Sequence, residues 1–368
     1  KTGTATHDVD YTLPSTITIP AGLLSSFIQL NAMSDTLNEL AETIVLDVTA
    51  VENGTEFETQ QQTITITNDD NAPTVTLSVI SGAISETAPG NSTTVQASVN
   101  TPSGLPVTVK ILTSGTPKIG IDYTLPLTIV IPAGQSFASV SLTSVGDLLY
   151  ELDETVVIDI DTVENGTELN IQRKEVIITD DENPPFVTLS VDNTSIGETL
   201  GTTFANVKAS LSVVSGLDVT VTLVKTGTAA ETADYTLNST IMIPAGTTFA
   251  SITLTALNDT LDEFDETVII DIGPVNNGTE SSTQQKTVTI NDNTDPPTVT
   301  LSAGVSINES LPGNSTQVTA TLNRISAKIV TVSITKSGEA KEGIDYTLGG
   351  SIFISAGALT GSTTLTAI

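Results

Sequence analysis

The acidic side chains of this chain fall into groups, and the groups recur at a fixed interval along the sequence. The copies align on an Asp-Tyr dipeptide that begins at residues 10, 122, 234 and 345. Carboxylates then fall in register near the start of each copy, at the Asp-Tyr pair, in a central acidic run and at the end. In chain order these candidate metal-ligating residues are Asp10, Asp35, Glu39, Glu42, Asp69 and Asp70; Glu86, Asp122, Asp147, Glu151, Glu154, Asp180, Asp181 and Glu182; Glu198, Asp234, Asp259, Glu263, Glu266, Asp292 and Asp295; and Glu309 and Asp345.

Carboxylates that gather in this way are suited to binding a hard cation. The groups fall at predicted strand ends and loops, and in a sandwich such loops meet at one end. Carboxylates within a few ångströms of one another repel, at on the order of 1–4 kcal/mol per close pair. Ca²⁺ accepts six to eight oxygen ligands in irregular geometry and fits better than Mg²⁺. The sequence therefore predicts Ca²⁺ as the bound ion.

A solvated acidic face that only keeps the protein soluble is the alternative interpretation of these residues. One Asp-Glu cluster taken alone favours that interpretation, whereas register across three copies at four separate positions favours Ca²⁺. Asp47, Asp159 and Asp271 also recur at 112-residue intervals, but they alternate with apolar residues inside predicted strands. We interpret these three as outward-facing strand residues and not as ligands.

The repeat also predicts the domain organisation. Asn-Gly-Thr begins at residues 53, 165 and 277, and Ile-Pro-Ala-Gly begins at residues 19, 131 and 243. Short proline-bearing segments precede a similar strand in successive copies, and proline stiffens such joins. We expect one partial module, two complete modules and a second partial module, in an array that extends beyond this chain. The predicted boundaries are 1–72, 73–184, 185–296 and 297–368.

Within each copy the polar and apolar residues alternate with a period of two. Ser-Ile-Thr-Leu at residues 251–254 is typical of a strand with one buried face. Turn signals every 8–12 residues or so predict about seven short strands per copy. The predicted fold class is all-β, with tandem Ig-like antiparallel β-sandwich modules of about 111 residues arranged end to end. The tyrosine of each Asp-Tyr pair is expected to pack at a corner between loop and sheet.

Composition excludes several classes of function. Twelve basic residues stand against 43 acidic ones, giving a net charge of −31, so nucleic acid and anionic lipid are poor partners. Apolar runs long enough for a membrane helix are missing from the sequence, so direct membrane insertion is not expected. The chain lacks cysteine and has one histidine, which rules out disulfides and thiolate metal sites. Nothing pairs a nucleophile with a base, so we predict no enzymatic activity.

These residues resemble the Calx-beta domain, a Ca²⁺-binding sandwich. The resemblance covers essentially the whole chain and is carried by Asp-Tyr, the Pro-Ala-Gly turn, the Asp-x-x-x-Glu-x-x-Glu run and the terminal Ile-Thr-Asp-Asp-Glu at residues 178–182. It implies Ca²⁺ as the cofactor and implies that the carboxylates named above are the ligands. Asn68, Asn293 and Thr294 stand where this pattern has carboxylates, so the number of ions can differ between copies.

The resemblance extends to tandem arrays on large bacterial surface proteins, and it implies a structural role. We expect a Ca²⁺-stiffened stalk segment of an extracellular adhesin on a bacterial cell surface, including the gliding-motility type. Neighbouring repeats of the same chain would be its partners, while a surface polysaccharide, host or substratum ligand would bind through other regions. A Ca²⁺-sensing regulatory module is one alternative, and repeats that themselves bind carbohydrate or protein are another.

Overall fold

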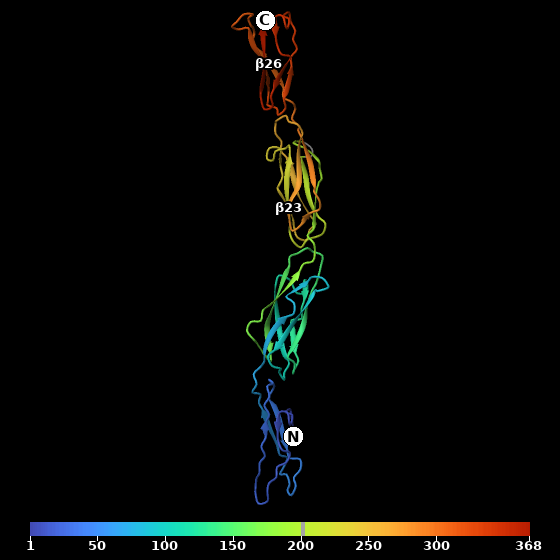
Figure 1. The fold of residues 1–368 in the computed structure, drawn as a ribbon, viewed down its shortest axis with the longest axis vertical. Helices are drawn as coiled ribbons and strands as arrows, with labels where there is room; N and C mark the ends of the chain where they lie inside the picture. The colour runs from blue at the N-terminus through green and yellow to red at the C-terminus, as the bar shows by residue number, and fades with distance from the viewer. Residues whose placement is uncertain (200–202) are drawn as a thin grey trace. The chain divides into compact units, whose positions relative to one another are not determined.

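The computed structural model describes residues 1–199 and 203–368, and within these ranges every regular element is a β-strand (Figure 1). The all-β fold class is therefore confirmed. The described residues contain no helix that is long and apolar enough to cross a membrane. The chain divides into two compact units, Lys1–Leu148 with Leu152–Asp181, and Leu149–Glu151 with Glu182–Ile368.

The first predicted segment, residues 1–72, has one three-stranded sheet with the order β1-β4-β5 and one pair, β2-β3. All of these pairings are antiparallel. The strands are Thr2–Gly3 (β1), Tyr11–Thr12 (β2), Asn31–Ala32 (β3), Glu42–Asp47 (β4) and Gln61–Ile66 (β5).

The second segment contains two five-stranded sheets. The first has the order β10-β12-β8-β6-β14, with strands Thr74–Val79 (β6), Ser92–Val99 (β8), Tyr123–Thr124 (β10), Phe137–Ser144 (β12) and Thr167–Glu168 (β14). The second has the order β11-β9-β13-β15-β7, with strands Ala83–Ser85 (β7), Val107–Gly115 (β9), Thr128–Ile131 (β11), Glu154–Glu164 (β13) and Lys174–Thr179 (β15). Two short pairings, β14 with β6 and β7 with β15, are parallel, and the others are antiparallel as predicted.

The third segment repeats this arrangement. One sheet has the order β20-β22-β18-β16-β24, with strands Phe186–Val191 (β16), Phe204–Leu211 (β18), Tyr235–Thr236 (β20), Phe249–Ala256 (β22) and Thr279–Glu280 (β24). The other has the order β17-β25-β23-β19-β21, with strands Ser195–Gly197 (β17), Val219–Gly227 (β19), Thr240–Ile243 (β21), Glu266–Asn276 (β23) and Gln285–Asn291 (β25). β23, labelled in Figure 1, is the central strand of its sheet.

The fourth segment has a four-stranded sheet with the order β26-β27-β31-β29 and the pair β28-β30. The strands are Val299–Ala303 (β26), Ser315–Leu322 (β27), Val330–Ser333 (β28), Tyr346–Thr347 (β29), Ser351–Ile354 (β30) and Thr360–Ala367 (β31).

Burial explains why these sequences form sandwiches. In β8 the side chains alternate between buried and half-buried positions, as the period of two predicts. Inward-facing Val95 of one sheet and Val109 of the other belong to the same core cluster, so the two sheets pack through one apolar layer. Each fully buried Val, Leu or Ile contributes roughly 1.5–3 kcal/mol to folding. The described residues hold four such clusters, one in each predicted segment.

The Asp-Tyr pairs show how the core positions a carboxylate. Tyr11, Tyr123 and Tyr235 are buried, which confirms their predicted packing, while Tyr346 is half-buried. Each tyrosine opens a two-residue strand, so the aspartate before it is held at the end of a sheet. In the first three copies, burial of the ring therefore fixes the position of a neighbouring charge that is itself only half-buried.

Candidate metal centre

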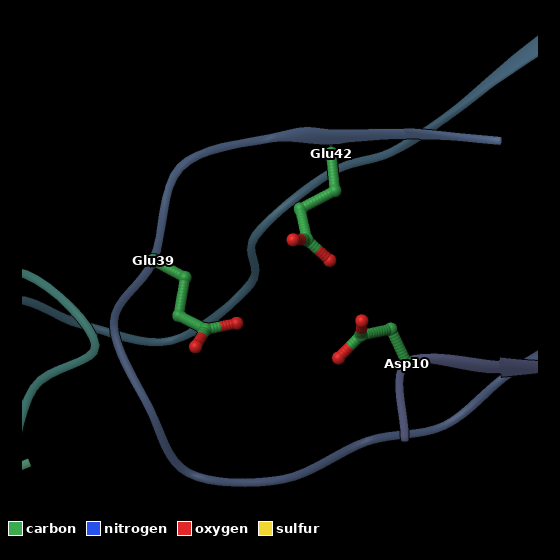
Figure 2. A group of neighbouring side chains, drawn as sticks. All are labelled: Asp10, Glu39 and Glu42. Carbon is green, nitrogen blue, oxygen red and sulfur yellow. The ribbon is translucent and has the colours of Figure 1, made fainter. Parts of the chain in front are cut away.

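Three carboxylates converge at one end of the first segment (Figure 2). Asp10 precedes β2, Glu42 is the first residue of β4, and Glu39 lies in the loop before β4. Each of the three offers a carboxylate oxygen within 4.8 Å of the others, and all three residues are half-buried. In Figure 2 the three side chains point into a common space, which is the arrangement a cation requires.

The remaining predicted residues of this segment line the same pocket. Asp35, Asp69 and Asp70 are in its wall together with the three converging carboxylates. Asp35 caps its own loop by accepting a hydrogen bond from the Leu37 amide at 2.7 Å. The six carboxylates that the sequence placed together here are therefore brought together by the fold.

Asn68 takes part in this site in a way that the sequence did not predict. Its side-chain oxygen accepts a hydrogen bond from the Glu39 amide at 3.2 Å, and its side-chain nitrogen donates to the Asp70 carbonyl at 2.9 Å. The residue that replaces a carboxylate thus ties the central acidic loop to the closing acidic segment. It can supply an amide oxygen as a neutral ligand.

The backbone holds the Asp-Tyr carboxylate in the same way in every copy. Asp10 accepts a hydrogen bond from the amide of Thr6 at 2.5 Å, and Asp122 and Asp234 accept equivalent bonds from the amides four residues earlier, also at 2.5 Å. Asp345 has the same bond at 2.7 Å. A fixed aspartate at this position reduces the ordering that a bound ion would have to impose.

The third segment builds the same group from the equivalent residues. Asp234, Glu263 and Glu266 offer oxygens within 4.8 Å of one another. Asp292 accepts a hydrogen bond from the Glu263 amide at 3.3 Å, and Asp259 accepts one from the amide of Leu261 at 2.7 Å. The central acidic run and the closing aspartate are thereby held at one site.

Glu198 adds a buried carboxylate to this site. It is 9% exposed, and its Oε2 atom is buried and has no hydrogen-bond partner among the described residues. Burial, followed by the charges of Asp292, Asp259, Glu263 and Asp234, raises the pKa of Glu198 to about 7. Five of the predicted ligands of this segment, Glu198 among them, therefore interact electrostatically with one another at this site.

The pKa values of other site carboxylates move in the same direction. Burial, then the hydrogen bond and charge of Asp234, raises the pKa of Glu266 to about 7. Burial, followed by Asp35, Asp10 and Asp70, raises the pKa of Glu39, and burial followed by Asp10 raises that of Glu42. In each case burial and neighbouring negative charges disfavour the charged form of the carboxylate.

In the second segment, Glu86 and Asp180 offer carboxylate oxygens within 4.8 Å of each other, and Glu86 is buried. Asp181 accepts a hydrogen bond from Thr87, which follows Glu86. Asp147 is exposed in the loop after β12, and Glu154 is the first residue of β13. Glu151 and Glu182 belong to the second compact unit, where the Glu151 side chain lies against Gly216.

Three predicted residues are not brought into a group. Glu309 and Asp345 are exposed, and the carboxylate groups found among the described residues include neither of them. Asp295 is exposed, and its backbone carbonyl accepts a hydrogen bond from Arg324. The control positions Asp47, Asp159 and Asp271 lie in strands β4, β13 and β23, outside the acidic groups.

One family model matches most of the chain. A profile of the Calx-beta domain matches residues 1–71, 68–182 and 180–294. A search of curated protein sequences gave no match. The matched ranges follow the sequence repeat and contain the acidic groups of the first three segments.

Similar solved structures include calcium binding domain CBD12 of CALX1.1, which is 17% identical over 54% of this chain and 79% of that chain, with a TM-score of 0.26. The apo-form Calx CBD1 domain is 18% identical over 29% of this chain and 98% of that chain, with a TM-score of 0.25. A two-domain protein of unknown function from Bacteroides fragilis NCTC 9343 is 12% identical over 60% and 93%, with a TM-score of 0.24. At these TM-scores the structural likeness carries no argument of its own.

Proposed function

The chain belongs to the Calx-beta domain family, and on that premise we propose that it binds Ca²⁺ at the acidic ends of its repeated modules. The observation that carries this proposal is the recurrence of one three-carboxylate group. Asp234, Glu263 and Glu266 each lie 224 residues, twice the 112-residue repeat, after Asp10, Glu39 and Glu42 respectively. Chance surface charge does not reproduce a converging group at equivalent positions.

The residues present fit a hard divalent cation. The donor set is made of carboxylate oxygens with nearby backbone and amide oxygens, which is the set that Ca²⁺ prefers. In the third segment Glu198, Asp234, Glu263, Glu266 and Asp292 would hold the ion, and in the first segment Asp10, Glu39, Glu42 and Asp70. Burial and neighbouring negative charges raise the pKa of Glu198, Glu266 and Glu39, and a bound cation would favour the charged form of these three carboxylates.

We further propose that the array is a structural stalk segment of a large adhesin on a bacterial cell surface. Recurrence of the same carboxylate positions in successive segments suits a spacer better than a sensor. Ca²⁺ at the module ends would restrict motion at the short proline-bearing joins. Neighbouring repeats are then the direct partners, and other regions of the protein would contact the surface to which the cell adheres.

Thermal unfolding of the full 368-residue chain tests the Ca²⁺ proposal. At a Ca²⁺ concentration 100 times the dissociation constant, each site should stabilise its module by roughly 2.7 kcal/mol relative to EDTA. Mg²⁺ at equal ionic strength should stabilise less. A melting curve that is the same in Ca²⁺ and EDTA would contradict the proposal.

Two variants of one strand provide the matched control. Glu266→Gln and Asp271→Asn each remove one negative charge from β23, but only Glu266 belongs to the carboxylate group. We expect Glu266→Gln to reduce the Ca²⁺-dependent rise in melting temperature and Asp271→Asn to leave it unchanged. Equal effects would show that the acidic surface acts only diffusely.

Small-angle scattering of the same chain tests the stalk proposal. A stiffened array should have a larger maximum dimension and a narrower range of shapes in Ca²⁺ than in EDTA. If neither quantity responds although the melting temperature does, the ions stabilise the modules individually and the stiffening proposal is wrong.

A further inference from the structure

The loop that follows β27 contacts the central acidic loop of the third segment, and both lie in the second compact unit. Ser326 is buried, and its Oγ atom donates to the Asp262 carbonyl at 3.2 Å. The first unit has the equivalent contact, in which buried Ser103 donates to the Asn38 carbonyl at 3.0 Å. Buried Ser215 makes the same kind of contact in the second unit, where its Oγ atom donates to the Tyr150 carbonyl at 3.4 Å, so the described residues hold this serine contact at three places.

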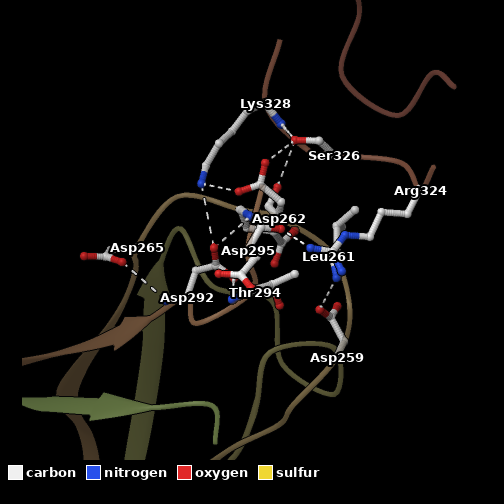
Figure 3. Close-up of polar contacts among 11 residues, drawn as sticks. Asp259, Leu261, Asp262, Asp265, Asp292, Thr294, Asp295, Arg324, Ser326 and Lys328 are labelled. Atoms are coloured by element: carbon white, nitrogen blue, oxygen red, sulfur yellow. Dashed lines mark hydrogen bonds and ion pairs between the residues drawn. The ribbon is translucent and has the colours of Figure 1, made fainter. Parts of the chain in front are cut away.

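The contact in the second unit has an additional ion pair, drawn in Figure 3. Lys328 Nζ lies 2.7 Å from Asp262 Oδ1, and Ser326 Oγ donates to Asp262 Oδ2, also at 2.7 Å. Asp262 is only 3% exposed. An ammonium group at this distance from a buried carboxylate makes a charge-assisted hydrogen bond, and its removal would leave a buried charge without compensation.

Lys328 also approaches the acidic site itself. Its Nζ lies 3.7 Å from Oδ2 of Asp292, whose side chain is 8% exposed, and 5.2 Å from the centre of the Phe264 ring. The same Asp292 oxygen accepts the hydrogen bond from the Glu263 amide. One carboxylate thus connects the lysine to the group formed by Asp234, Glu263 and Glu266.

The equivalent positions elsewhere in the chain are uncharged. Aligned on the buried serine, Lys328 corresponds to Leu105 and Leu217, and Asp262 corresponds to Asn38. Arg324, which corresponds to Thr101 and Val213, donates to the Asp295 carbonyl. Lys328, Arg324 and Asp262 therefore occur together at the join between residues 185–296 and 297–368. The corresponding positions of the other repeats named above carry no charged residue.

The closing run of the acidic site beside Lys328 has fewer carboxylates than its counterpart in the second segment. The closing run Asp180-Asp181-Glu182 carries a formal charge of −3, whereas the corresponding Asp292-Asn293-Thr294 carries −1. The fixed positive charge of Lys328 offsets that remaining charge. Asn293 and Thr294 inside the site, and Lys328 from the next segment, all make the site less negative.

We propose that Lys328 is a built-in counter-ion for the acidic site of the preceding segment. It holds the join between residues 185–296 and 297–368 closed without Ca²⁺, and it weakens Ca²⁺ uptake at the side of the site that Asp292 forms. The second statement rests on the proposed Ca²⁺ function, whereas the first does not. An array with such a join keeps one fixed connection when Ca²⁺ is removed.

The first statement is tested in EDTA on the full chain. Because the chain lacks cysteine, Ser190→Cys and Thr331→Cys place one spin label on exposed positions of each segment, and double electron–electron resonance gives the distance distribution. We expect a narrow distribution that Lys328→Leu broadens at least about twofold. Lys328→Arg should keep it narrow, since the positive charge remains. Exposed Lys341 lies in the same segment, and Lys341→Leu, which removes an equal charge, should not change it.

A distribution that Lys328→Leu leaves unchanged would overturn the proposal, provided that circular dichroism shows the variant folded. If Lys328→Leu does not fold, the widths of the distance distributions of Lys328→Arg and Lys341→Leu in EDTA test the first statement instead. The proposal requires a narrow distribution in both, and a broad distribution in the unsubstituted background would contradict it.

Calorimetric titration of the same chains with Ca²⁺ tests the second statement. Lys328→Leu should raise the affinity of one class of site by roughly tenfold or more, because a unit charge within a few ångströms of a divalent ion has an effect of that order. Lys341→Leu should leave every class unchanged. Identical isotherms for Lys328→Leu and the unsubstituted chain would overturn this statement. Failure of all the chains to take up Ca²⁺ would instead refute the proposed function, and the measurement in EDTA would still decide on the join.

Discussion

The acidic sites of the first and third segments are built from the same repeated carboxylates but have different surroundings. In the first, Asp10, Glu39 and Glu42 are half-buried, and neutral Asn68 bridges the two acidic loops. In the third, a buried Glu198 adds negative charge, and Lys328 adds positive charge beside Asp292. A repeated carboxylate pattern therefore does not imply a repeated electrostatic environment, because the residues around the pattern set the net charge of each site.

Acidification should change the stability of the third segment most. Glu198 and Glu266 have folded-state pKa values of about 7, above the usual 4.5. Between these values the folded state binds more protons than the unfolded state, so stability falls as pH rises through 7. In EDTA, lowering the pH from 8 to 5.5 should raise the melting temperature of the third segment by about 5 °C or more.

In saturating Ca²⁺, lowering the pH from 8 to 5.5 should instead lower the melting temperature. The reason is that the ion binds deprotonated carboxylates and protons compete with it. Differential scanning calorimetry at both pH values, with and without Ca²⁺, measures the effect. A melting temperature in EDTA that falls on acidification in this range would contradict the interpretation that burial and neighbouring negative charges disfavour the charged form of these carboxylates.

The substitution Glu198→Gln should have opposite effects in the two conditions. In EDTA at pH 8 it removes a buried uncompensated charge and should stabilise the protein by about 1–2 kcal/mol. In Ca²⁺ it removes a ligand and should lower both the affinity and the melting temperature. Chemical denaturation of Glu198→Gln beside Asp271→Asn, which alters a strand carboxylate outside the site, checks both signs. The same sign in both conditions would mean that Glu198 is structural only.

Transfer of the ion pair to the first join should have the smallest effect. Asn38→Asp with Leu105→Lys reproduces the Asp262–Lys328 pair beside Ser103, and a partly exposed pair of this kind contributes about 0.5 kcal/mol. Spin labels at Gln61→Cys and Ser139→Cys should then show a narrower distance distribution in EDTA. Leu105→Lys alone adds the charge without its partner, and equal narrowing by this single variant would argue against a specific pair.

The sequence by itself determined the local structure and the chemical character of this protein. The period of two in β8 fixes which side chains face inward, since successive residues of a strand point to opposite faces. The 112-residue interval between Asp10, Asp122 and Asp234 identifies equivalent positions before any contact is known. Profile matches at three successive ranges agree with that interval. Which carboxylates act as ligands, and the exact domain boundaries, remain predictions.

Only the tertiary structure decided which charges meet. Asp262 and Lys328 are 66 residues apart and lie in different repeats, and each one alone has the pattern of an exposed loop residue. Glu198 likewise is buried and lies near Asp292, Asp259 and Glu263, residues 61 or more positions away in the sequence. The physical reason is that electrostatic energy depends on distance and on exclusion of water, and both are set where loops from separate parts of the chain come together.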